Sequence, residues 1–294
     1  MDFSIPIAFT PLDQLVPLAQ AAERLGFARI TLPDSLFYPR SQEKEYPYTP
    51  DGSRMWDENT PWVEPFVGAM AMAQATSTIR MCPSVVKFGP RQPLLLYRQA
   101  ASVAMMSGGR LDLGVGIGWD PNEFEWCGVP FAKRGARVDE MLEIFRLAGT
   151  GDFFSYSGEH FSFEELSLAP VPPDPIPLYI GGHSKKALAR AARVGMGWTS
   201  AMIEFDQLSD VIATLGENLR AAGRSLADRG DGNPFAIQVV SMDKFGTAGF
   251  ADLAGAGVTD VIVMPWMMSG LGFDAPVEDK IATMETFADK YIRG

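Results

Sequence analysis

The sequence predicts a (β/α)8 TIM barrel, an α/β fold in which eight parallel strands alternate with helices, as a single domain over residues 1–294. Short runs of branched apolar residues alternate with stretches whose apolar residues recur at helical spacing. The strand-like runs number eight, and each is almost continuously apolar, as expected for strands covered on both faces. The length alone does not decide, because it suits one barrel with insertions as well as two ordinary domains.

The expected strands follow one another at regular intervals. They are residues 3–9, 28–32, 79–87, 111–116, 177–180, 198–201, 235–240 and 258–264.

The helices are predicted from apolar stripes and from the residues that begin and end them. One runs from Ser184 to Val194, and another is capped by Asp206 and stops before Gly223. Pro93 suits the first turn of a further helix, and a stripe around Met141 predicts one that stops at Gly149. Residues 277–291 form the last helix. Pro17 interrupts the first helical pattern, so that helix starts late or is kinked.

Two segments break the repeat and are predicted to be insertions, after strand two (residues 33–60) and before strand five (residues 150–175). The second holds a cluster of prolines. Long stretches without regular structure inside compact folds are commonly lids or binding loops, and this is the role expected for both.

Composition excludes several classes of function. The formal charge of −11 and pI near 4.7 repel phosphate backbones and anionic lipid, so neither nucleic acid nor a membrane is an expected partner. Cys82 and Cys127 are expected to be reduced thiols, and His160 and His183 are too few and too far apart to indicate a metal site. No targeting or membrane segment is evident, so the protein is expected to be cytoplasmic and to act on a small molecule.

The segment Leu113-Gly-Val-Gly-Ile-Gly-Trp119 resembles a dinucleotide fingerprint, but that motif needs a helix directly after its last glycine. Asp120-Pro121-Asn122 follows, and the next helical stripe begins near Gly135, which disfavours a Rossmann interpretation. The glycines suit a backbone that lies against a flat ring, or close packing between the strand and a neighbouring helix.

A candidate anion site follows the fifth strand. Ile180-Gly181-Gly182-His183-Ser184-Lys185-Lys186 leads directly into a helix, so backbone N–H groups, the helix dipole and two lysines converge there. The alternative is an ordinary turn in which Ser184 caps the helix and the lysines face water. Lys87 is the last residue of the third strand and Arg91 follows it, and these two cations either meet an anionic group or are solvated.

Asp34 and Ser35 follow the second strand, where barrel enzymes place catalytic groups, although Asp34 also suits a loop cap. The loop behind them is rich in aromatic residues, including Tyr38 and Trp56. These rings either cover an apolar substrate or pack the loop on itself.

Together these segments resemble the luciferase-like monooxygenase superfamily and, within it, the deazaflavin (F420) dependent oxidoreductases. The resemblance covers most of residues 3–200 in order and spacing. It is carried by Arg98-Gln99-Ala100-Ala101, Ser107 to Trp119, Asn122-Glu-Phe124, Gly128, Arg134 to Glu140, Tyr156-Ser-Gly158, Pro177 to Gly182, Ala187 to Ala192 and Gly197-Trp198.

The resemblance implies roles for individual residues. A bulge behind the cofactor's tricyclic ring matches Ser84-Val85, whose peptide bond is therefore predicted to be cis. Phosphate contacts are implied at Gly181 and Gly182, with His183 and Ser184. Ring-edge contacts are implied at Asp34, Gly116 and Asn122, and attraction of an acidic cofactor tail at Lys87 and Arg91.

The function expected from the resemblance is hydride transfer between coenzyme F420 and a small apolar or aromatic substrate held under the loop of residues 33–60. Asp34 or Ser35 would assist a proton, and Tyr38, Trp56 and Trp119 would shape the pocket. Members that oxidise sugar phosphates carry Asp-His at the Asp34-Ser35 position and Glu at that of Trp119, so that activity is not expected.

The alternatives are an FMN-dependent luciferase-like monooxygenase and a barrel that stores flavin without turnover. A homodimer is expected, because members of the superfamily commonly pair through barrel helices.

Overall fold

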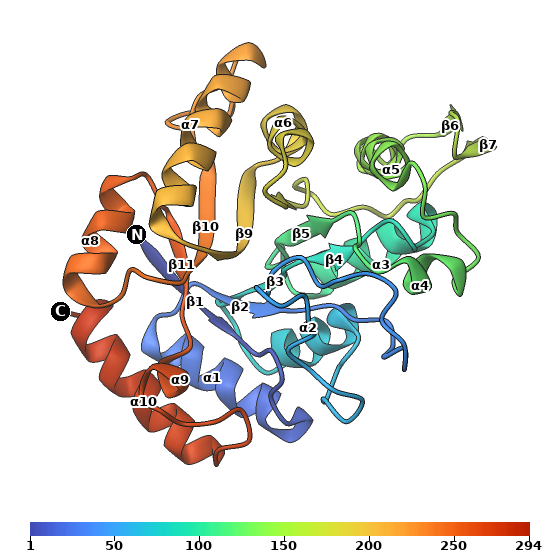
Figure 1. Ribbon diagram of the computed structural model, residues 1–294. Helices are drawn as coiled ribbons and strands as arrows, with labels where there is room; N and C mark the ends of the chain where they lie inside the picture. Colours follow the sequence, from blue (N-terminus) through green and yellow to red (C-terminus); the bar gives the residue numbers. More distant parts are fainter.

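The computed structural model describes residues 1–294 and has the predicted fold, a nearly closed parallel barrel surrounded by helices (Figure 1). Nine strand segments form one sheet, in the order β3-β2-β1-β11-β10-β9-β8-β5-β4. The segments are β1 (Asp2–Pro6), β2 (Arg29–Leu32), β3 (Arg80–Pro83), β4 (Val86–Lys87), β5 (Leu113–Gly116), β8 (Leu178–Gly181), β9 (Gly197–Ile203), β10 (Ala236–Ser241) and β11 (Asp260–Ile262).

The nine segments amount to eight barrel strands, because β3 and β4 are two parts of one strand interrupted only by Ser84 and Val85. β4 pairs with β5, and Met81 of β3 forms a parallel bridge to Leu111 just before β5. The sheet therefore closes on itself. The predicted strands are confirmed in order and position, although residues 7–9, 111–112, 258–259 and 263–264 lie outside the observed strands.

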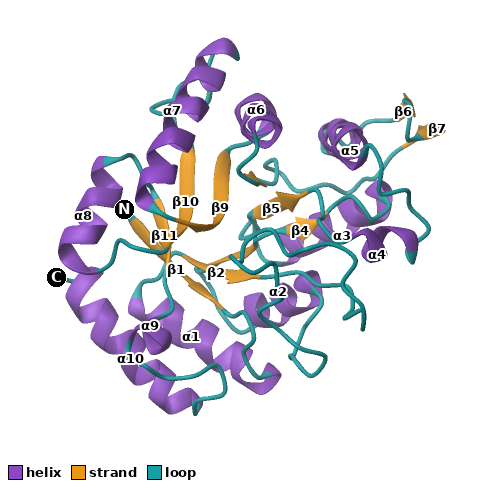
Figure 2. Ribbon diagram, viewed as in Figure 1, coloured by secondary structure: helices purple, strands orange, loops and turns teal.

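Helices cover the outside of the barrel (Figure 2). They are α1 (Leu15–Leu25), α2 (Pro65–Gln74), α3 (Pro93–Met106), α4 (Pro121–Glu125), α5 (Arg134–Ala148), α6 (Lys185–Val194), α7 (Phe205–Ala221), α8 (Gly246–Gly255), α9 (Pro265–Met268) and α10 (Val277–Tyr291), with a short 3-10 turn at Leu12–Gln14 before α1.

The predicted helix ends are confirmed with one exception. Ser184 caps α6, Pro93 is the first residue of α3, and α1 starts late enough for Pro17 to fall in its first turn. The prediction that Asp206 caps its helix was wrong, because Glu204 holds that position and Asp206 already lies in the first turn of α7. An acidic residue in the first turn also favours a helix N-terminus, so sequence alone does not separate the two positions.

The two insertions differ in structure. Residues 33–60 contain no helix or strand, as predicted, whereas residues 150–175 include an antiparallel hairpin of β6 (Phe154–Ser157) and β7 (Ser162–Leu166) beside α5. The carboxylate of Glu140 in α5 accepts backbone N–H bonds from Glu159, His160 and Phe161 at the hairpin turn. This stabilisation comes from a residue about 20 positions earlier, which the local pattern of the hairpin does not reveal.

A buried polar network fills the amino-terminal end of the barrel. Asp260 accepts hydrogen bonds from Ser4 (2.7 Å) and Gln238 (2.8 Å), and Arg29 lies between Asp260 (3.3 Å) and Asp112 (2.9 Å). Burial raises the pKa of Asp260, although Arg29 opposes that effect. Because this end is plugged by paired charges, a ligand has access to the barrel only from the carboxyl ends of the strands.

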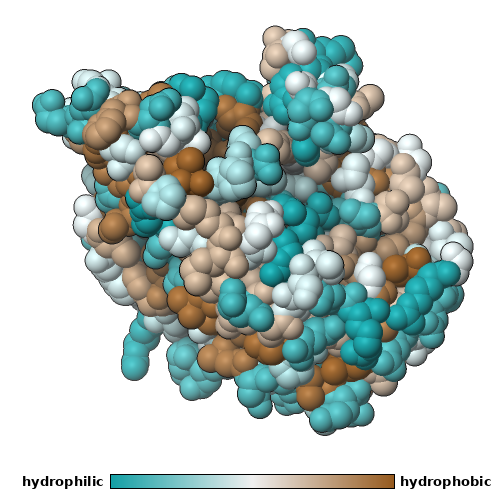
Figure 3. All heavy atoms as spheres, turned by 180° about the vertical axis from the view of Figure 1, so that it is seen from behind, coloured by the Kyte–Doolittle hydropathy of each residue, from teal (hydrophilic) through white to brown (hydrophobic).

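The surface opposite to the view of Figure 1 carries several small apolar patches separated by polar residues (Figure 3). No helix is both long enough and apolar enough to cross a bilayer.

Candidate active site

The floor of the barrel mouth contains a bulge at Ser84-Val85, where the peptide bond is cis as predicted. The Val85 side chain lies over two neighbouring strands. A Cβ atom added at Gly116 would lie 2.5 Å from Val85 Cγ2, and one at Gly181 would lie 2.8 Å from Val85 Cγ1. At Gly114, an added Cβ would lie 2.5 Å from the Pro83 carbonyl oxygen. These glycines are therefore needed to make room for the bulge.

The glycine-rich segment also packs against a helix that the sequence did not predict. α4 begins directly after it, because Asp120 accepts a hydrogen bond from the Asn122 N–H (3.0 Å) and Pro121 occupies the first turn. A Cβ at Gly118 would lie 2.7 Å from the ring of Phe124 in α4. The expectation that the next helix begins near Gly135 was wrong, since a helix of five residues is too short to show an apolar stripe.

Asp34 lies at the end of β2, with its carboxylate held by three hydrogen bonds. Arg91 donates to both oxygens, at 3.1 Å to Oδ1, and the Lys87 backbone N–H donates to Oδ2 at 2.8 Å. The Asp34 side chain is 1% exposed and that of Arg91 is 13% exposed. Since Oδ1 receives only one donor, it retains a lone pair for a ligand N–H.

The charge of the Lys87 side chain is balanced by a buried carboxylate. The Lys87 Nζ lies 2.5 Å from Glu123 Oε1, which also accepts the Leu36 N–H at 3.1 Å. Burial raises the pKa of Glu123, with Lys87 opposing the effect. Lys87 and Arg91 are therefore paired inside the protein and not solvated. No role was predicted for Glu123, although it lies inside the Asn122-Glu-Phe124 segment that carries the family resemblance.

Two buried acceptors next to this network have no protein partner. They are Asn122 Oδ1 and Glu123 Oε2. The other end of the Asn122 amide donates weakly to the Ser41 carbonyl at 3.4 Å, which links α4 to the loop of residues 33–60. A buried polar atom without a partner is costly, so these atoms indicate a missing donor from water or a ligand.

The end of β8 provides a set of free backbone donors. Gly182 has a φ of +103°, and the backbone N–H groups of Gly182, His183 and Ser184 donate to no acceptor within the protein. Ser184 uses its side chain to cap α6 by accepting the Ala187 N–H at 3.2 Å. Successive free amides at the start of a helix form a concave site for an anion, so the capping role and the anion site coexist.

His183 links this turn to the loop above. Its ring lies 5.7 Å from that of Tyr48 and 5.7 Å from that of Trp198, and its Nε2 is buried without a partner. Burial lowers the pKa of His183, which favours the neutral imidazole near pH 7.

The loop of residues 33–60 covers the mouth with aromatic rings. Tyr46 packs edge-on against Trp119 (5.2 Å) and Trp56 (5.1 Å). Trp56 also stacks on Phe9, 6.3 Å away at the end of β1. Burial raises the pKa of Tyr46 to about 12, so its hydroxyl stays protonated at neutral pH. Trp56 and Trp119 are thus brought together, and they contact rings of the loop and of the barrel.

Not all of the predicted pocket residues join this cluster. Tyr38 lies instead under the Arg54 guanidinium, 3.9 Å from its ring centroid, and the Ser35 hydroxyl has only a 3.5 Å contact to the Phe37 carbonyl. Phe9 was missed as a site residue. Its φ of +57° is rare for a bulky side chain, and no sequence signal reveals it.

Comparisons with known proteins agree with this architecture. The family model described as luciferase-like monooxygenase matches residues 4–238. An uncharacterised protein of Mycobacterium tuberculosis is 40% identical over 99% of both chains. The F420-dependent hydroxymycolic acid dehydrogenase of the same species is 26% identical over 72% of this chain and 55% of its own length. The pyrimidine monooxygenase RutA of Allorhizobium ampelinum is 25% identical over 77% and 62%.

Two solved structures share the fold over nearly their full length. A monooxygenase from Streptomyces bottropensis has a TM-score of 0.77 at 18% identity, covering 100% of this chain and 99% of its own. A coenzyme F420 dependent tetrahydromethanopterin reductase from Methanopyrus kandleri has a TM-score of 0.74 at 17% identity, covering 99% and 98%. With the family match extending from the first strand into the seventh, the chain belongs to the luciferase-like monooxygenase family.

Proposed function

We propose that this protein is an F420-dependent oxidoreductase that transfers a hydride between the deazaflavin and a small apolar organic substrate. The main support for the proposal is the set of free backbone amides at residues 182–184, which directly follow β8 and lie beside the Val85 bulge. β8 pairs with β5, which pairs with β4, so anion-binding and floor elements are neighbours in the barrel. This arrangement suits a planar ring that carries a phosphate tail.

The residues present fit such a group. The amides of Gly182, His183 and Ser184 would hold the phosphate, and Asp34 Oδ1 and Asn122 Oδ1 would accept hydrogen bonds from the ring edge. The bound deazaflavin supplies the hydride chemistry, while the protein orients it and excludes water.

The two cations that were expected to meet an acidic tail have other partners. Lys87 and Arg91 form ion pairs with Glu123 and Asp34. The tail would therefore meet the exposed Lys185 and Lys186 at the start of α6 instead.

Proton transfer is better assigned to Ser35 than to Asp34. The Asp34 carboxylate is fixed between Arg91 and the Lys87 N–H, which favours an acceptor that orients the ring over one that exchanges protons. The Ser35 hydroxyl is half-buried and weakly engaged, so it is free to contact a substrate oxygen. Trp56 and Trp119 would form the aromatic wall of the substrate pocket, and Tyr38 would lie at its edge.

An FMN-dependent monooxygenase is the second candidate, since the relatives include a monooxygenase as well as an F420-dependent dehydrogenase. Stopped-flow mixing with each reduced cofactor separates the two. Oxidation of reduced F420, but not of reduced FMN, by candidate acceptors supports our proposal, and the opposite result replaces it with the alternative. A storage barrel would retain oxidised flavin through purification and show no turnover with either cofactor.

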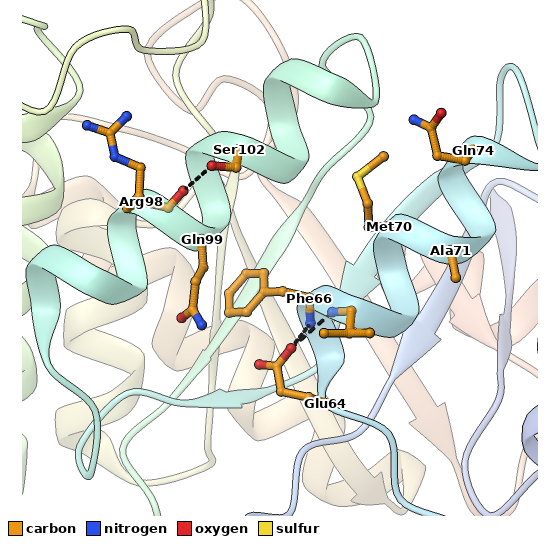
Figure 4. Close-up of a pocket in the computed structure, with 9 residues that line it drawn as sticks. Glu64, Phe66, Met70, Ala71, Gln74, Arg98, Gln99 and Ser102 are labelled. Atoms are coloured by element: carbon orange, nitrogen blue, oxygen red, sulfur yellow. Dashed lines mark hydrogen bonds between the residues drawn. The ribbon is translucent and has the colours of Figure 1, made fainter.

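We also propose that two copies of the chain pair through α2 and α3. A groove of about 550 Å³ lies between these helices, with Phe66 and Gln99 on its facing sides (Figure 4). Val67 on α2 and Leu95 on α3 are 64% and 66% exposed, unusually high for apolar residues on helices. Glu64 and Arg98 line the same groove, so the face carries both signs of charge and can be self-complementary. Light scattering should give a dimer that Val67→Arg converts to a monomer, and a monomeric wild type would contradict this.

A further inference from the structure

Methionines gather at the carboxyl ends of three consecutive barrel strands. Of the 15 methionines in the chain, five stand at the ends of β9, β10 and β11. They are Met202, Met242, Met264, Met267 and Met268. We call this group the methionine arc.

Strand alternation places part of the arc on the floor of the mouth. Gln238 and Asp260 point into the barrel, where they bond to each other, so Val240 and Ile262, two residues further along, face the same way. Met202 pairs with Val240 across β9 and β10 and shares its face, beyond a register irregularity that adds one residue to β9 and leaves the spacing of β10 unchanged. Met264 lies two residues beyond Ile262, where β11 ends. Met202, Val240 and Met264 are half-buried, which is the exposure expected at the bottom of an open mouth.

The remaining methionines form the rim above this floor. Met242, Met267 and Met268 are 49%, 43% and 44% exposed. The last two belong to the short helix α9, which follows β11 directly. Large apolar side chains grouped at the mouth of a barrel, and left open to water, mark a binding surface.

The two halves of the mouth differ in chemistry. Asp34, Asn122 and the free amides of residues 182–184 lie on the side of β2, β4, β5 and β8. On the other side, none of Met202, Val240 and Met264 can donate a hydrogen bond. A ligand part that lies there is therefore apolar, whereas the polar cofactor contacts are all on the opposite half.

Methionine also indicates the shape of that ligand part. Its unbranched, flexible side chain adapts to chains of different length and conformation, whereas rigid aromatic ligands are better matched by ring stacking. In this protein the rings of the loop of residues 33–60 pack against one another and against Phe9, and Trp266, the ring within α9, is fully buried.

We propose that the methionine arc is a subsite for a flexible, unbranched aliphatic chain of the substrate. The inference rests on the proposed function for its setting, because it places the reacting end of that substrate over the cofactor half of the mouth.

Calorimetric titration with straight-chain secondary alcohols, from butanol to decanol, tests the subsite with and without F420. Affinity should rise about fourfold for each added methylene group that enters the arc. Benzyl-type alcohols of equal carbon number should bind more weakly than the straight chains.

Two variants at opposite ends of the same strand provide a matched comparison. Met202→Gln should weaken decanol binding roughly tenfold and leave butanol unchanged, because only the longer chain reaches the floor. Met196→Gln alters an equally half-buried methionine just before β9, at the plugged end of the barrel, and should change neither affinity.

The outcomes separate this inference from the proposed function. A flat dependence on chain length, tighter binding of aromatic alcohols, or equal effects of the two variants overturns the subsite. Affinity for F420 and FMN is measured separately by fluorescence titration. If neither cofactor binds while the chain-length dependence is steep, the proposed function fails and the subsite stands. If F420 binds and the dependence is flat, the reverse holds.

Discussion

The fit between the bulge and the glycines of the neighbouring strands predicts a specific energetic coupling. In Gly116→Ala the new methyl group would lie 2.5 Å from Val85 Cγ2, far inside van der Waals contact. Overpacking of this kind costs about 1–3 kcal/mol of unfolding free energy. Val85→Ala alone removes two methyl groups from a half-buried side chain and costs about 1 kcal/mol.

The double variant should be little less stable than Val85→Ala alone. Once Cγ2 is removed, the nearest atoms to the new methyl are Val85 Cβ at 3.3 Å and the Val86 carbonyl oxygen at 3.6 Å. The clash is thereby relieved. In the double-mutant cycle, the double variant should therefore be about 1–2 kcal/mol more stable than the sum of the two single effects predicts. Urea unfolding, followed by tryptophan fluorescence and circular dichroism, provides the four free energies.

Gly114→Ala is the control for this reasoning. Its methyl group would meet the Pro83 carbonyl oxygen at 2.5 Å and Ser84 Cα at 2.9 Å, and both are backbone atoms that Val85→Ala leaves in place. Gly114→Ala should therefore be equally destabilising with Val85 or with alanine at position 85. If Gly116→Ala behaves in the same way, without rescue, then Val85 is not the reason for the glycine.

Three further perturbations test the charged groups. Burial opposes ionisation of Glu23, but three backbone N–H bonds outweigh it and lower its pKa to about 2. Its stabilisation is present above the usual value of 4.5 and is lost as the pH falls toward 2, so Glu23→Gln should remove about 1–2 kcal/mol of acid dependence from urea unfolding, after allowance for solvent screening. Lys87→Met leaves Glu123 buried without its cation and should cost about 3–5 kcal/mol, with Glu123→Gln in the same chain restoring much of it. Because the pKa of Glu123 is already raised by burial, the single variant should lose stability as the pH rises above the normal range for glutamate, and a flat profile would contradict this. Arg91→Lys keeps the charge but loses the two-pronged contact with Asp34, so fluorescence titration should show roughly tenfold weaker cofactor binding with little change in melting temperature.

The order of the barrel strands and the cis peptide at Ser84-Val85 were predicted from different kinds of information. The eight strands follow from local apolar patterns, because a parallel strand covered on both faces is apolar along its whole length. The cis bond came from the family resemblance and not from any local propensity. The hairpin at residues 154–166 was missed because its strands are largely exposed and lack a continuous apolar run. The helix α4 was missed because five residues are too few to show a helical stripe.

The residues of the candidate site were proposed from the sequence, but the contacts between them were not. Asp34 and the Gly181-Gly182 turn follow the ends of β2 and β8 as predicted, because the βα-loops of a barrel meet at one face, and Asn122 lies in the helix α4 that follows β5. Their partners were not predictable. The pairing of Arg91 with Asp34, and of Lys87 with Glu123, joins residues 57 and 36 positions apart. Whether a cation is free for a ligand or consumed by a neighbour depends on that packing.

The sequence by itself determined the fold class, the position of the mouth and the residue types that surround it, since these depend on local periodicity and on the fixed chirality of βα units. Only the tertiary structure decided which charges cancel, why Gly114, Gly116 and Gly181 lack side chains, and which half of the mouth is apolar. Those properties depend on closing the barrel, which brings the ends of distant strands within a few ångströms of one another and converts separate segments into one surface.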